Sequence, residues 1–153
     1  GQYSIHQERG TMVMMTSGPI TEMYFGFTPD VLFLRIDFDA PSAQVLPAYD
    51  RLRIRFAEPE GYELEVLQPG SANPKIRLLR NGQEVAASGI QYAQNQIAEL
   101  AIPFDTLGVA LDQPVAFYVE LMEGNQSRDR APRDSTIQLQ RPSPDFERIN
   151  WDV

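Results

Sequence analysis

The sequence predicts an all-β fold, a sandwich of two antiparallel sheets with about ten strands. Apolar and polar residues alternate in short runs along the chain, which is the period of a half-buried strand. Proline, glycine, asparagine and aspartate separate these runs at short intervals, so helices have little room. The chain has 153 residues, the length of one ordinary domain. We therefore expect a single β-sandwich over residues 1–153.

The first predicted hairpin pairs residues 23–27 with residues 32–39 through a Thr-Pro-Asp turn at residues 28–30. Successive side chains of a strand point to opposite faces of the sheet, so one face of this hairpin is apolar. That inward face holds these core candidates: Met23, Phe25, Phe27, Leu32, Leu34, Ile36, Phe38.

The second predicted hairpin pairs residues 52–56 with residues 62–66. Its inward face holds a second set of core candidates: Leu52, Ile54, Phe56, Tyr62, Leu64, Val66. The matching register forms a ladder of opposite charges on the outward face: Arg53 with Glu65, Arg55 with Glu63. Each such pair contributes about 0.2–1 kcal/mol, so we interpret the ladder as a stabilising solvated face and not as a binding site.

The third predicted hairpin joins residues 76–78 to residues 85–87 through Asn81-Gly82, which suits a type I′ turn. Later strands are expected at these positions: residues 90–92, 97–102, 115–122 and 136–139, with Phe146, Ile149 and Trp151 closing the last segment. We expect the charged residues around Pro132 to lie in a loop.

Composition excludes several classes of partner. The net charge is −8, from 21 acidic and 13 basic residues, which opposes binding to a phosphate backbone and excludes nucleic acid as a partner. No apolar run reaches the about 20 residues that span a bilayer, so no membrane partner is predicted. Cysteine is absent, which excludes disulfides and thiolate metal sites and permits a cytoplasmic location, the one we expect.

The order of several strand signatures carries a family resemblance: residues 24–27, 32–37, 99–104, 107–108, 130–132 and 146–151. They resemble the C-terminal accessory β-sandwich of glycoside hydrolase family 57 enzymes. That domain is similar to the glucodextranase C-terminal domain, carbohydrate-binding module family 9 and other DOMON-like sandwiches. The resemblance implies a noncatalytic domain in a longer polypeptide, whose catalytic domain would precede Gly1 and act on α-glucans such as starch or glycogen.

The residues themselves also indicate that this chain is not an enzyme. His6 is the single histidine, so a Ser-His-Asp triad could be built in only one way, close to the N-terminus. A retaining glycosidase needs two carboxylates about 5–5.5 Å apart, and nothing among the 21 acidic residues selects such a pair.

No cofactor is predicted. Some DOMON-like domains hold haem through Met and His, and this chain has such residues near its N-terminus: His6, Met12, Met14, Met15. Methionines that alternate along a strand are more often core filler, so we do not expect haem. Calcium binding remains an alternative, because two pairs of carboxylates offer hard oxygen ligands: Asp37 with Asp39, Asp129 with Asp134. Neighbouring arginines favour salt bridges for the second pair.

The best candidate binding surface is the outward face of the first hairpin. If Phe25 packs inward against Leu34, the register gives three outward pairs: Tyr24 with Arg35, Gly26 with Phe33, Glu22 with Asp37. A flat aromatic ring suits the C–H face of a pyranose, and carboxylates or arginine suit its hydroxyls. The candidate carbohydrate-binding residues are these: Tyr24, Phe33, Arg35, Asp37, Trp151.

The same surface suits a contact between domains. Phe33 would also cover the backbone at Gly26, and exposed apolar patches of multidomain proteins more often mark protein contacts. Two hypotheses therefore remain: a module that tethers its enzyme to α-glucan, and an interaction module that packs on the catalytic domain without binding sugar. Glu99 shares its strand face with apolar residues, so we expect it to form an ion pair with an arginine.

Overall fold

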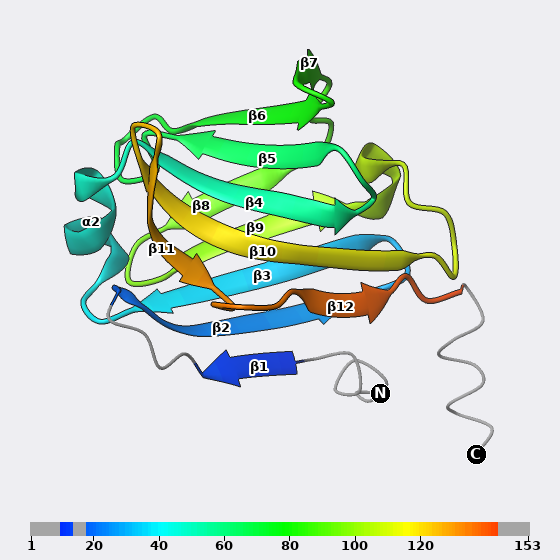
Figure 1. The fold of residues 1–153 in the computed structure, drawn as a ribbon, viewed down its shortest axis with the longest axis horizontal. Coiled ribbons are helices and arrows are strands. Elements are labelled where there is room, and N and C mark those ends of the chain that lie inside the picture. Colours follow the sequence, from blue (N-terminus) through cyan, green and yellow to red (C-terminus); the bar gives the residue numbers. More distant parts are fainter. Residues whose placement is uncertain (1–9, 14–17, 144–153) are drawn as a thin grey trace.

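Two antiparallel β-sheets pack face to face in the computed structural model, which describes residues 10–13 and 18–143 (Figure 1). Over these residues, the five-stranded sheet has the order β1 (Gly10–Val13), β2 (Ile20–Phe27), β3 (Val31–Phe38), β9 (Ala98–Pro103), β8 (Gln91–Gln94). The seven-stranded sheet has the order β11 (Gln126–Ala131), β10 (Pro114–Glu123), β4 (Arg51–Glu58), β5 (Tyr62–Leu67), β6 (Lys75–Arg80), β7 (Gln83–Val85), with β12 (Ile137–Gln140) also paired to β10. The predicted all-β, two-sheet sandwich is confirmed.

Short helices connect the two sheets. The helix α2 (Ser42–Val45) continues into the 3-10 helix η1 (Leu46–Ala48) after β3, and the 3-10 helix η2 (Phe104–Leu107) follows β9. Figure 1 shows α2 at one end of the sandwich and η2, in yellow-green, at the other. No helix in the described part of the chain has the length and apolarity needed to cross a bilayer.

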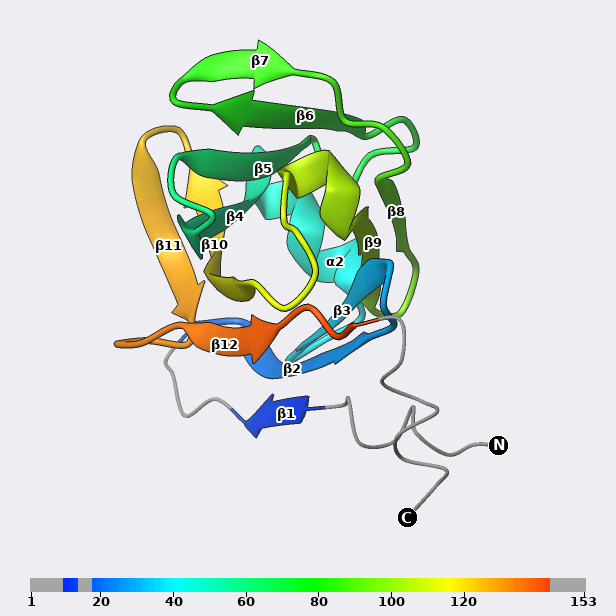
Figure 2. The ribbon, with the colours of Figure 1, turned by 90° about the vertical axis from the view of Figure 1, so that its right-hand side faces the viewer.

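The core lies between the sheets, which curve around a shared interior (Figure 2). The five-stranded sheet contributes these buried side chains: Ile20, Met23, Leu32, Leu34, Ile36, Leu100, Ile102. The seven-stranded sheet contributes these: Leu52, Ile54, Leu64, Val66, Leu78, Val115, Phe117, Val119, Leu121. Phe25, Phe27 and Tyr62 are partly buried and pack against this cluster. Both predicted inward faces are therefore confirmed, and each fully buried side chain of this kind contributes about 1.5–3 kcal/mol.

The predicted hairpins form with the expected turns, although the second strand of the third hairpin ends at Val85 and leaves out residues 86–87. Phe25 lies opposite Leu34, and the backbone N–H of Thr28 donates to the carbonyl of Val31 at 3.0 Å across the first turn. Asn81 and Gly82 have φ angles of 52° and 81°, as a type I′ turn requires. This turn joins β6 directly to β7.

The charge ladder has the predicted register but different contacts. Both predicted cross-strand pairs are in register: Arg53 with Glu65, Arg55 with Glu63. Arg55 contacts Glu63 at 3.2 Å, whereas Arg53 binds Glu120 of β10 at 2.7 Å. Glu65 instead lies between Arg51 and Arg77, with a side chain only 3% exposed. The ladder therefore extends across neighbouring strands, and it buries a carboxylate that the hairpin alone would leave in solvent.

The loop prediction around Pro132 is wrong for the residues before it, because β11 pairs with β10 there. Arg130 lies across from Glu120 on the outward face, and its guanidinium sits 3.7 Å from the ring centroid of Tyr118. Asp129 and Ala131 are buried. Because this edge strand has a carboxylate at an inward position, it lacks the apolar alternation by which strands are recognised.

Candidate functional site

The predicted outward face of the first hairpin is one surface of the five-stranded sheet. Four of the five candidate residues lie on it, in the registers expected: Tyr24 across from Arg35, Phe33 across from Gly26, Asp37 across from Glu22. Strands β9 and β8 extend the surface beyond the hairpin. We call this surface the aromatic platform, defined by these residues: Glu22, Tyr24, Gly26, Phe33, Arg35, Asp37, Ala93, Glu99, Ala101. The fifth candidate, Trp151, lies outside the described residues.

Phe33 is the aromatic centre of the platform. Its directly paired neighbours are Gly26 on β2 and Ala101 on β9, which carry no side chain or a single methyl group. Such small neighbours cannot cover the ring, and Phe33 remains 45% exposed. Among the described residues, Leu111 is the other large hydrophobic with comparable exposure, at 42%. An exposed ring over glycine and alanine offers a flat apolar contact of the kind that ligands use.

Polar groups beside Phe33 hold one another in fixed orientations. Arg35 donates from Nε and Nη2 to the two carboxylate oxygens of Asp37, at 2.9 and 3.1 Å. The same guanidinium lies 4.9 Å from the ring centroid of Tyr24. The Tyr24 hydroxyl donates to Glu22 Oε2 at 3.1 Å. Bidentate pairing and cation–π contact both restrict the arginine, so a ligand would meet an oriented group rather than a freely rotating one.

These contacts also reinforce the protonation states that arginine and tyrosine ordinarily have at neutral pH. The hydrogen bond to Asp37 raises the pKa of Arg35, and the charges of Asp37 and Glu99 act in the same direction. The hydrogen bond to Glu22 raises the pKa of the Tyr24 hydroxyl. At neutral pH the platform therefore presents a guanidinium cation and a neutral phenol.

Glu99 lies across from Arg35 in the register between β3 and β9. The predicted ion pair is wrong as a direct contact, because the Arg35 guanidinium hydrogen-bonds to Asp37 and Glu99 remains exposed. The charge of Glu99 nevertheless contributes to the raised pKa of Arg35. Its carboxylate is left available to accept hydrogen bonds from a ligand.

An open groove of about 1140 Å³ adjoins the platform. Its lining combines platform residues with side chains from the edges of the two sheets, including Ile76 of β6 and Tyr92 of β8. Tyr92 packs against the core and donates its hydroxyl to the Pro69 carbonyl at 2.8 Å, so it is a structural wall and not a free aromatic. Burial raises the pKa of Tyr92, which keeps this hydroxyl a donor. The groove is large enough for a ligand of several rings.

Two of the four candidate calcium ligands, Asp37 and Asp129, have other partners. Both oxygens of Asp37 accept hydrogen bonds from Arg35. Asp129 accepts from the backbone N–H groups of Ile20 and Arg130, and lies on β11 rather than in a loop. Within residues 10–13 and 18–143, no cluster of three or more His, Cys, Asp or Glu side chains could hold a metal ion.

The haem candidates cannot be placed as a set. Three of them lie outside the described residues: His6, Met14, Met15. Met12 belongs to β1, where its backbone pairs with Met23 of β2.

Sequence reasoning found the β2–β3 half of the platform and missed the half that β8 and β9 supply. Ala93, Glu99 and Ala101 reach the platform through pairing between β3 and β9, which lie far apart in the chain. No local pattern carries that pairing, although the small residues at Ala93 and Ala101 are consistent with an uncovered ring. Comparison with family models, curated proteins and solved structures found no match for the chain.

Proposed function

We propose that the chain is a noncatalytic accessory β-sandwich of an α-glucan-active glycoside hydrolase and that it binds carbohydrate through the aromatic platform. The observation that carries this proposal is the exposed ring of Phe33 between Gly26 and Ala101, beside hydrogen-bonding groups that are already oriented. The glucan as ligand, and a glycoside hydrolase family 57 enzyme as the parent, come from the resemblance of the strand signatures.

The chemistry of the platform suits a pyranose. The C–H face of the sugar would stack on Phe33, and its hydroxyls would donate to the carboxylates of Glu22 and Glu99 or accept from Arg35. An open surface buries little of its ligand, so affinity would be modest. Tethering would then act by raising the local concentration of glucan near the catalytic domain of the same polypeptide.

The proposal assigns this chain no catalytic residue, no cofactor and no nucleic-acid or membrane partner. It includes a cytoplasmic location, which a sequence without cysteine permits. Glucan hydrolysis by these 153 residues alone would contradict the noncatalytic part of the proposal.

Isothermal titration with maltoheptaose and glycogen tests the binding. Phe33→Ala should weaken binding about tenfold or more, because a stacked aromatic contact of about 1.5 kcal/mol is lost. Leu111→Ala is the matched control, since Leu111 is a similarly exposed hydrophobic outside the platform. Absence of heat with any α-glucan, or an equal loss of affinity in both variants, would contradict the proposal that the platform binds carbohydrate.

A second candidate function uses the same surface as a contact for the catalytic domain. The uncovered Phe33 and the adjoining groove favour it, because exposed apolar patches commonly mark protein interfaces. In this case the backbone amides of the platform strands would be protected from hydrogen exchange in the parent polypeptide, even when no sugar is added. Phe33→Asp would remove that protection, whereas Leu111→Asp would leave it unchanged.

A further inference from the structure

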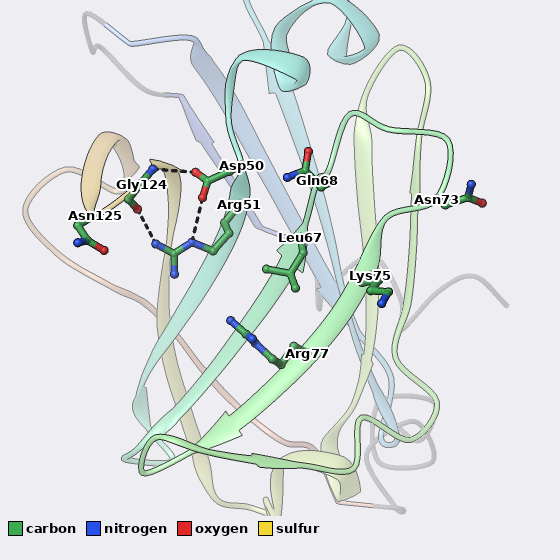
Figure 3. A pocket seen from close by; sticks show the side chains of 9 residues that line it. All are labelled: Asp50, Arg51, Leu67, Gln68, Asn73, Lys75, Arg77, Gly124 and Asn125. Carbon is green, nitrogen blue, oxygen red and sulfur yellow. Dashed lines mark hydrogen bonds and ion pairs between the residues drawn. The ribbon is translucent and has the colours of Figure 1, made fainter.

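A second pocket, of about 600 Å³, lies on the outward face of the seven-stranded sheet (Figure 3). Its floor includes Arg51, Leu67 and Lys75, which are neighbours in one row across β4, β5 and β6. Figure 3 shows Asn125 at one side of this floor and Asn73 at the other. These two residues come from the β10–β11 turn and the β5–β6 loop.

The pocket is locally cationic in an acidic protein. Arg51 and Arg77 both bind the buried carboxylate of Glu65, so two guanidinium groups share one negative charge. Lys75 is exposed and forms no ion pair with any residue that the structure describes. Counted over the lining residues and Glu65 alone, one positive charge remains in excess, whereas the whole chain carries −8; Glu84 of β7, outside the lining, also acts on Arg77. An excess cation in such a chain favours an anionic ligand over a neutral one.

Arg77 defines the geometry of recognition. Its Nε–H and one Nη2–H donate to Glu65 Oε1, which leaves both Nη1 hydrogens and the second Nη2 hydrogen for a ligand. Figure 3 shows Arg77 extending from β6 toward Arg51, on the same side of the sheet as Leu67. The free Nη1–Nη2 edge of Arg77 and the ammonium group of Lys75 both suit an oxyanion such as a carboxylate or a phosphate.

The walls of the pocket are held in place before any ligand arrives. Asp50 Oδ1 accepts from the backbone N–H of Gly124 at 2.9 Å, and Arg51 Nη2 donates to the Gly124 carbonyl at 2.6 Å. At the start of the β5–β6 loop, Gln68 has a positive φ of 54° and its N–H donates to the Asp50 carbonyl at 2.9 Å. Loops fixed in this way lose little entropy on binding.

We infer that this pocket binds a small hydroxylated anion, a sugar acid or a sugar phosphate. Lys75 and Arg77 Nη1 supply the donors for the carboxylate or phosphate. The side-chain amides of Gln68 and Asn125 supply donors and acceptors for hydroxyls, and Leu67 offers an apolar contact to the carbon skeleton. The site lies on the sheet opposite the aromatic platform, so this inference does not depend on the proposed function.

Isothermal titration of the intact chain with glucose 6-phosphate, glucuronate, glucose and inorganic phosphate tests the site. The two sugar anions should bind, and glucose should bind at least about tenfold more weakly. Added salt should weaken the binding of both anions. Lys75→Gln should weaken both anions about fivefold, the equivalent of one exposed charge contact. Arg80→Gln is the matched control, because it removes one positive charge from the same strand outside the pocket.

Each alternative outcome overturns the inference. Equal binding of glucose and of its anionic analogues would remove the role of Lys75 and Arg77. Equal effects of Lys75→Gln and Arg80→Gln would mean that the anions are attracted by the overall electrostatic field of the protein and not by contacts in the pocket. Inorganic phosphate that binds as tightly as glucose 6-phosphate would exclude recognition of the hydroxylated carbon skeleton.

Discussion

Arg141 joins segments that lie far apart in the chain. Its Nε donates to the Pro29 carbonyl at 2.7 Å, in the turn between β2 and β3. Its Nη1 donates to Asp105 Oδ1 at 2.8 Å and to the Val109 carbonyl at 2.7 Å, next to η2. The guanidinium also lies 5.4 Å from the ring centroid of Phe104. The contacts of this one buried side chain thus hold the segment after β12 against one end of the sandwich.

Arg141→Leu should lower the free energy of unfolding by about 3 kcal/mol, because the carbonyls of Val109 and Pro29 lose a charged donor. The Asp105 side chain is 88% exposed, so the loss of its ion pair adds little. Urea denaturation measures this value. Arg128→Leu is the control, since Arg128 binds Glu123 with both side chains about half exposed. Such a surface pair is worth less than about 1 kcal/mol. Equal losses in the two variants would contradict the role given to Arg141.

The partners of Arg141 could not be predicted from its neighbours in the sequence. They lie 32 to 112 residues away, so no local pattern distinguishes Arg141 from the exposed arginines. Tyr24 and Arg35 are the contrasting case. Their contact crosses one hairpin, so the alternation of two adjacent strands was enough to predict it.

At the scale of elements, the β6–β7 hairpin depends on its turn. Gly82 has a φ of 81°, and a Cβ added there would meet nothing within 4 Å. Gly82→Val should therefore cost about 1–2 kcal/mol through backbone strain alone. Gln83→Val, at the neighbouring exposed position in β7, should change stability little. Urea denaturation that shows no difference between these two variants would mean that the hairpin does not require the positive φ.

The hairpins could be predicted because each pairs two strands that are adjacent in the sequence. The strand β11 could not be predicted. The strands β2–β3, β4–β5 and β6–β7 each show alternation on both sides of a recognisable turn. The β11 strand instead has Asp129 at an inward position. A polar residue there interrupts the alternation of apolar and polar residues by which a strand is recognised. A carboxylate is tolerated there because backbone N–H groups satisfy it.

At the scale of the whole molecule, the two outward faces have different characters. The five-stranded sheet exposes an aromatic ring beside fixed polar groups, whereas the seven-stranded sheet buries carboxylates between arginines. The sequence predicted both faces in outline from hairpin alternation. The order in which hairpins join was not predictable, because pairings such as β3 with β9 and β10 with β4 connect distant segments. That order completes the platform and buries Glu65 and Glu120.

Asp129 links the two sheets and gives the molecule a distinct dependence on pH. Its Oδ2, on β11, accepts from the Ile20 N–H of β2 at 2.8 Å. Burial raises the pKa of this carboxyl, against the opposing effect of its backbone hydrogen bonds. A raised folded-state pKa means that the native state holds the proton more tightly than the unfolded chain. This contribution to stability is therefore complete at acid pH and is lost as pH rises through the folded-state pKa.

Asp129→Asn removes this titration and keeps an oxygen acceptor for Ile20. The difference in unfolding free energy between variant and native protein should therefore shift in favour of the variant as pH rises from acid to neutral. Urea denaturation across that range measures it, and the other carboxylates cancel in the difference. A shift in favour of the native protein would mean that the backbone hydrogen bonds outweigh burial, so that the link between the sheets is strongest when Asp129 is charged.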